Sequence, residues 1–119
     1  MSNQQISNLL RTAKGKIESE GWVQGVSRRS KSSDPLFEYT IKSRVDNFFF
    51  GGPDKYGYCM SGAIFSSDGG EIFGMQAIDI LATIIGQSVS SWNDKEGRKK
   101  SEVLLEFDIA IASLEESDA

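Results

Sequence analysis

The only cysteine of the chain, Cys59, is the residue best suited to covalent chemistry. It stands in the stretch YCMSGAI, where a short helix beginning at the cysteine could lower the pKa of its thiol. The chain has no histidine, which excludes a Cys–His pair, a Ser–His–Asp triad and a histidine-ligated zinc within one chain. We therefore interpret Cys59 as a small apolar side chain of the core. The protein is predicted not to be an enzyme and to hold no metal or cofactor, with a cysteine-dependent enzyme using Cys59 as an alternative.

Two basic segments form a second candidate site. Positively charged side chains interleaved with aromatic rings can bind a ligand that has a phosphate group and a base that stacks on the rings. A nucleotide-like anion is therefore a predicted ligand, and its candidate residues are Arg28, Arg29, Lys42, Arg44, Arg98 and Lys99. The formal net charge of −4 argues against general binding to nucleic acid.

Three apolar stripes predict the helices that must position these residues. They run over residues 6–17, 72–85 and 103–114. The middle stretch has so little polar face that we expect it to be the most buried helix. A short helix is expected within 58–66, whereas residues 88–100 have the composition of a polar loop around Trp92.

Alternating apolar and polar residues over 36–42, and an aromatic run over 45–50, predict strands. We predict an α+β, helix-dominated single domain over residues 1–119. It would contain three main helices, the short helix and a small antiparallel sheet of two or three strands from residues 22–50. The predicted core consists of Leu10, Ile17, Trp22, Ala63, Phe73, Ile80, Leu81, Ile84, Trp92, Phe107 and Ile111.

Four short motifs follow one another along the chain: GWVQG at 21–25, CMSGA at 59–63, WND at 92–94 and GRKKSEV at 97–103. In this order the chain resembles a family of small bacterial and phage proteins of unknown function, with the pattern GWxQG, CxxGA, WND and GRxxxEV. The resemblance implies no activity. Lys99 replaces a threonine that often stands there in the family, so the helix cap is expected to shift to Ser101. The segment between GWVQG and the cysteine is also longer than the resemblance leads us to expect.

The motifs also have purely structural interpretations, which we favour over ligand binding. GWVQG suits the end of a helix followed by a tight turn. WND suits a turn in which Asn93 and Asp94 bond their own backbone while Trp92 anchors the loop in the core.

These observations predict a non-enzymatic binding protein. The candidate interaction surface for a protein partner or a second copy is an exposed strand edge with the aromatic residues Tyr39, Phe48, Phe49 and Phe50. The resemblance suggests an accessory factor of a phage or mobile element that acts on a host protein. A small-molecule binder that sequesters a nucleotide-like anion is the alternative. No signal peptide and no apolar run of about 20 residues is present, so we expect a cytoplasmic protein without a membrane partner.

Overall fold

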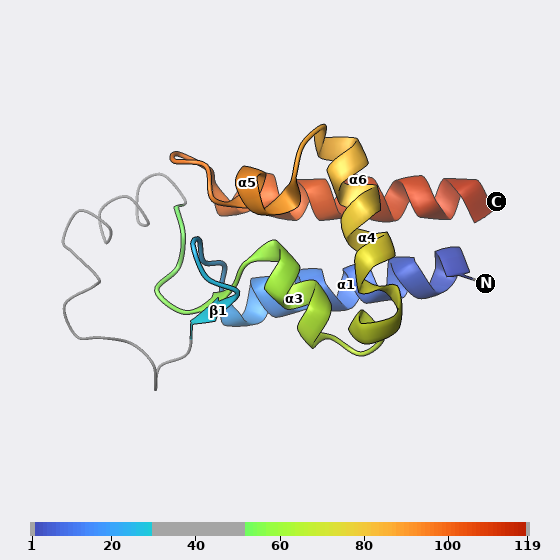
Figure 1. Cartoon of the computed structure of the whole chain (residues 1–119), viewed down its shortest axis with the longest axis horizontal. Helices are drawn as coiled ribbons and strands as arrows, with labels where there is room; N and C mark the ends of the chain where they lie inside the picture. The colour runs from blue at the N-terminus through green and yellow to red at the C-terminus, as the bar shows by residue number, and fades with distance from the viewer. Residues whose placement is uncertain (1, 30–51, 119) are drawn as a thin grey trace.

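The computed structural model describes residues 2–29 and 52–118. Helices dominate this part of the chain, and its two short strands form an antiparallel sheet (Figure 1). The predicted helix-dominated α+β class is therefore confirmed. The elements in chain order are α1 (Ser2–Glu20), β1 (Arg28–Arg29), β2 (Gly57–Tyr58), α3 (Met60–Ser66), α4 (Gly70–Ile85), α5 (Val89–Asn93) and α6 (Lys100–Asp118). The strands predicted over 36–42 and 45–50 lie outside the described residues.

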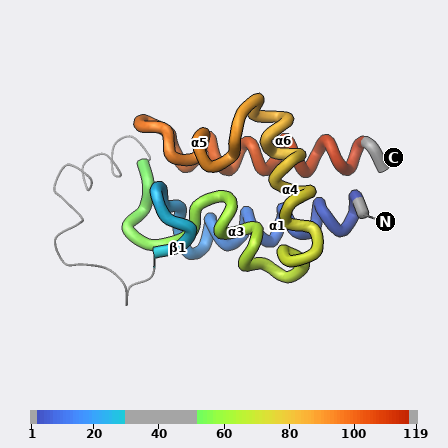
Figure 2. Tube along the Cα trace, in the orientation of Figure 1, coloured from blue at the N-terminus to red at the C-terminus, as the bar shows by residue number. Residues whose placement is uncertain are grey.

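The two longest helices, α1 and α6, lie side by side and antiparallel (Figure 2). Two ion pairs fix this direction, because Arg11 meets Glu115 while Lys14 meets Asp108 further along, with 2.8 Å between the Lys14 Nζ and an Asp108 oxygen. The facing stripes are those that periodicity predicted. Their buried members are Ile6, Leu9, Leu10, Ala13 and Ile17 on α1, and Val103, Phe107, Ala110, Ile111 and Leu114 on α6.

Helix α4 crosses this pair as an outer layer, and the expectation that it is the most buried helix is wrong (Figure 1). Its buried residues include Gly74, Ala77 and Leu81. Small residues on this face allow close packing, since a Cβ at position 74 would lie 2.5 Å from the Phe65 ring. The opposite face stays in solvent, where Ile72 is 75% exposed and Met75 is 64% exposed.

Most of the predicted core is confirmed as buried. The exceptions are the three α4 side chains Phe73, Ile80 and Ile84, which are only partly buried and pack against the edge of the core. They lie on the flanks of a helix that buries one face only.

The sheet pairs Arg28 with Tyr58 and Arg29 with Gly57, and Trp22 forms a further bridge to Tyr58. The predicted span of 22–50 is wrong for this pairing, because β2 lies beyond it. Two-residue strands are too short to leave an alternating pattern in the sequence. Trp22 is positioned by the end of α1, where Gly21 adopts a positive φ of 114° and donates its N–H to the Ile17 carbonyl. The predicted helix end at this glycine is confirmed.

The region 88–100, expected as a loop, contains the short helix α5 (Val89–Asn93). Ser88 caps it by accepting a hydrogen bond from the Ser91 N–H at 3.3 Å. Val89 and Trp92, three residues apart, are buried on the same side of this helix. Two apolar residues among polar ones were too few to reveal the helix by periodicity.

Candidate functional site

Residues of the GWVQG, CMSGA and WND motifs meet around one buried side chain, that of Asn93, which is 1% exposed. Its Oδ1 accepts hydrogen bonds from the Trp22 indole at 2.7 Å and the Met60 N–H at 3.1 Å. Its Nδ2 donates to the Val23 carbonyl at 3.2 Å and to Asp94 at 2.9 Å. Asn93 therefore bonds segments distant in sequence, and the predicted turn in which it bonds its own backbone is wrong.

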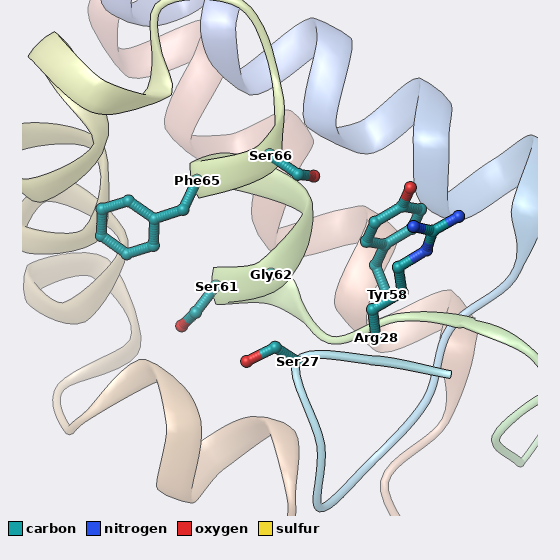
Figure 3. Close-up of a pocket in the computed structure, with 7 residues that line it drawn as sticks. All are labelled: Ser27, Arg28, Tyr58, Ser61, Gly62, Phe65 and Ser66. Atoms are coloured by element: carbon teal, nitrogen blue, oxygen red, sulfur yellow. The ribbon is translucent and has the colours of Figure 1, made fainter. Parts of the chain in front are cut away.

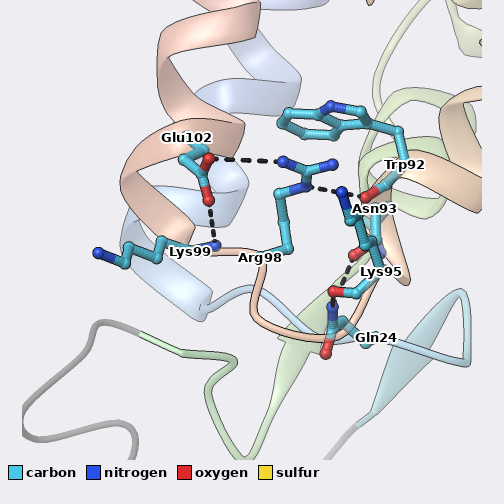
Figure 4. A network of polar contacts seen from close by, with 7 residues as sticks. All are labelled: Gln24, Trp92, Asn93, Lys95, Arg98, Lys99 and Glu102. Carbon is cyan, nitrogen blue, oxygen red and sulfur yellow. Dashed lines mark hydrogen bonds and ion pairs between the residues drawn. The ribbon is translucent and has the colours of Figure 1, made fainter.

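Gln24 and Asp94 extend this network to the surface. The Gln24 amide donates to the carbonyls of Asn93 and Lys95, at 2.8 and 2.9 Å (Figure 4). Asp94 accepts from the Gly25 N–H at 2.9 Å. Both side chains join the loop after α1 to the loop after α5, so their polar groups hold the structure together.

Arg98 connects the network to α6. Its guanidinium carbon lies 3.7 Å from the centre of the Trp92 ring, and its Nε donates to the Trp92 carbonyl at 3.0 Å (Figure 4). Its Nη1 lies 3.4 Å from Glu102. A cation stacked on an aromatic ring and bonded on two sides is committed to its neighbours, which makes Arg98 a structural residue here.

Glu102 also caps α6, because its Oε1 accepts the Lys99 N–H at 2.8 Å. This contact is the glutamate half of a capping box, with Lys99 in the cap position. The expected shift of the cap to Ser101 is therefore wrong. The cap forms without a threonine side chain at this position, because the Glu102 carboxylate accepts the hydrogen bond from the backbone.

Cys59 is the N-cap of α3, where its Sγ accepts the Gly62 N–H at 3.2 Å. Burial raises the pKa of this thiol, and the Asp94 carboxylate raises it further, against the effect of the backbone N–H groups. The short helix thus does not activate the sulfur as its N-terminus alone would. Cys59 is only half-buried, however, and it borders a cavity of about 230 Å³. Asp94 and the three serines Ser27, Ser61 and Ser90 also line that cavity.

The four candidate anion-binding residues that the structure describes, Arg28, Arg29, Arg98 and Lys99, do not line one common cavity. Arg28 and Arg29 lie on β1 and line two neighbouring cavities, whose linings include neither Arg98 nor Lys99. Lys42 and Arg44 lie outside the described residues. The same holds for the candidate interaction residues, Tyr39, Phe48, Phe49 and Phe50.

Two surfaces were missed at the sequence level. One is the exposed apolar group Phe65, Ile72 and Met75 on α3 and α4, which the unusually wide apolar stripe of α4 already signalled. The other is a cavity around Arg28 and Tyr58. Arg28 was a candidate for anion binding, but the sequence gave no signal for its partners in this cavity, which come from β2 and α3 as well as β1.

Among residues 2–29 and 52–118, no helix is long and apolar enough to cross a membrane. Within the same residues, no group of three His, Cys, Asp or Glu side chains is placed to hold a metal ion.

The comparison with protein families matches residues 1–113 to DUF6197, a family of unknown function. The chain belongs to this family, which confirms the resemblance inferred from the motifs. Neither the curated proteins nor the solved structures include a match. The chain's own surfaces therefore provide the indications of function.

Proposed function

We propose that this chain is a non-enzymatic binding protein that docks a protein partner on the exposed face of α3 and α4. The observation that carries the proposal is the exposure of Phe65, Ile72 and Met75. Ile72 and Met75 are one helical turn apart and so lie next to each other. Phe65 and Ile72 line the same groove, of about 380 Å³. Contiguous exposed apolar side chains are characteristic of interaction sites.

The charges around this groove indicate which partner it suits. Its lining carries two exposed carboxylates, Asp68 and Glu71, and no basic residue. Lys16 reaches the edge of the groove at Ser66, where two hydrogen bonds hold it. A partner segment with apolar side chains between lysines or arginines complements this surface. A second copy is disfavoured, because it would place the same carboxylates opposite one another and the chain already has a net charge of −4.

The proposal includes the host-directed accessory role expected from the resemblance, exercised in the cytoplasm. The convergence of the motif residues favours a scaffold over a catalytic centre. Trp22, Asn93 and Arg98 are all occupied by contacts within the chain, whereas internal packing does not explain the exposed apolar surface of α3 and α4.

The test uses two synthetic amphipathic peptides with the same leucines, one flanked by lysines and the other by glutamates. Fluorescence anisotropy should show tighter binding of the lysine peptide, and amide shift mapping by NMR should centre on Phe65, Ile72 and Met75. The double variant Ile72→Ser/Met75→Ser should weaken this binding at least tenfold. The matched control is Leu105→Ser, which changes an exposed apolar residue on α6.

Equal affinity for the two peptides, or shifts centred elsewhere, would overturn the proposed surface. Light scattering of the chain alone provides a second check. A dimer that the Ile72→Ser/Met75→Ser variant abolishes would show that the face belongs to a second copy and that the argument from charge is wrong.

A further inference from the structure

We infer that a separate cavity, between β1, β2 and α3, binds a small organic anion of about the size of a nucleoside monophosphate. This site differs from the docking surface proposed above, although Phe65 and Ser66 line both. The cavity has a volume of about 340 Å³, and its lining residues are Ser27, Arg28, Tyr58, Ser61, Gly62, Phe65 and Ser66 (Figure 3). Ligand pockets begin at about 300 Å³, so the space is sufficient for a small ligand.

The charge of the cavity favours an anion. No acidic residue lines it. The Arg28 guanidinium carbon lies 5.3 Å from the centre of the Tyr58 ring, and the Lys16 Nζ lies 5.3 Å from the same centre. Among the described residues Arg28 forms no ion pair, so its donors are available to a phosphate or carboxylate. A guanidinium binds either group through two parallel hydrogen bonds.

Tyr58 supplies a second, independent indication of a ligand. Its side chain belongs to the core, with 6% of the residue exposed, yet its phenolic oxygen has no hydrogen-bond partner among the described residues. A buried polar group without a partner requires an explanation, such as a bound molecule or water. An anionic group held by Arg28 would lie beside the Tyr58 ring and accept a hydrogen bond from its hydroxyl.

The remaining lining suits the uncharged part of such a ligand. Figure 3 shows Arg28 and Tyr58 on one side of Gly62, with Ser27, Ser61 and Phe65 on the other. The hydroxyls of Ser27 and Ser61 form no hydrogen bond within the described part of the chain. They can bond a sugar or a ring substituent, and the exposed Phe65 ring offers a face for stacking. A ligand that extends across Gly62 would use both sides.

The experiment titrates AMP, adenosine and inorganic phosphate into the full chain, followed by calorimetry and by NMR of labelled amides. AMP should bind at least tenfold more tightly than adenosine or phosphate, with shifts at Tyr58, Ser61 and Ser66. Arg28→Gln should weaken AMP binding at least tenfold and leave the weak adenosine binding unchanged. The control Arg29→Gln removes the neighbouring charge, which does not line this cavity, and should change AMP affinity by less than twofold.

The inference would be overturned if AMP caused no shifts at a concentration of about 10 mM, because the Kd would then be weaker than the NMR titration can measure. Equal losses in Arg28→Gln and Arg29→Gln would also overturn it, because they would indicate attraction to general positive charge. Because the NMR mapping uses the unmodified chain, the test does not depend on either variant folding. The lysine peptide of the docking test should shift Ile72 and Met75, which do not line this cavity, so each proposal can fail without the other.

Discussion

Replacing Asn93 by alanine removes the amide around which the motifs meet, and its effect on stability can be worked out from the structure. Three buried groups would lose their partner: the Trp22 indole N–H, the Met60 N–H and the Val23 carbonyl. Each unsatisfied buried group costs about 1–3 kcal/mol. Water entering the vacated space restores part of this, so we expect a loss of about 4 kcal/mol. For a chain of 119 residues, that corresponds to a decrease in Tm of roughly 16 °C.

Urea unfolding followed by circular dichroism measures this loss directly, provided that the slope of free energy against urea stays the same. The matched control is Asn8→Ala. Asn8 is exposed in α1, and among the described residues its side chain forms one hydrogen bond, accepted from Gln4 at 3.1 Å. We expect that control to change stability by at most about 0.5 kcal/mol. If Asn93→Ala and Asn8→Ala differ by less than about 1 kcal/mol, the Asn93 network does not hold the segments together and our reasoning is refuted.

The remaining predictions concern three positions: Gly62, Gly15 and Cys59. Gly62→Ala should destabilise by about 1–3 kcal/mol in the same urea assay, because its Cβ would lie 2.0 Å from the Ser27 carbonyl oxygen. Gly15→Ala, at a helical position with nothing within 4 Å, should instead stabilise by up to about 1 kcal/mol, and the opposite order would contradict the packing described. For Cys59, burial raises the pKa of the folded thiol. Its contribution to stability is therefore present below the unfolded pKa of about 8.5 and is lost as pH rises through the folded pKa. The stability of wild type relative to Cys59→Ser should decrease as pH rises above about 8.5; an increase would show that the folded thiol is more acidic than the unfolded one.

The sequence predicted the long helices well because their signal is local. The stripe from Ile6 to Ile17 repeats with the helical period, and a single glycine, Gly21, marks its end. Both features can be identified without knowledge of the rest of the chain. The burial of α4 was overestimated for the same reason. The pattern within one helix shows that most of its surface is apolar, but it does not show which side packs against the rest of the protein.

The candidate site was harder to predict because its contacts are distant in sequence. Asn93 meets Trp22 across 71 positions and Met60 across 33. Asparagine favours turns, and that preference pointed to a local role. Only the shared order of the four motifs hinted that these residues belong together, and it gave no information about which atoms meet. The stacking of Arg98 on Trp92 could not be predicted either, because a run of basic residues has the same composition whether or not one of them packs on an aromatic ring.

The antiparallel arrangement of α1 and α6 has a practical consequence for handling the protein. The first turn of α1 and the last turn of α6 lie at one extremity of the helix pair, whereas β1, which carries Arg28, lies near the other (Figure 1). Helix α1 has 19 residues and so spans roughly 28 Å. A fluorophore, an affinity tag or a sensor surface attached at either terminus would therefore be held away from the cavity that Arg28 lines. Joining the termini through a short linker would give a cyclic or circularly permuted chain in which both helices keep their present partners.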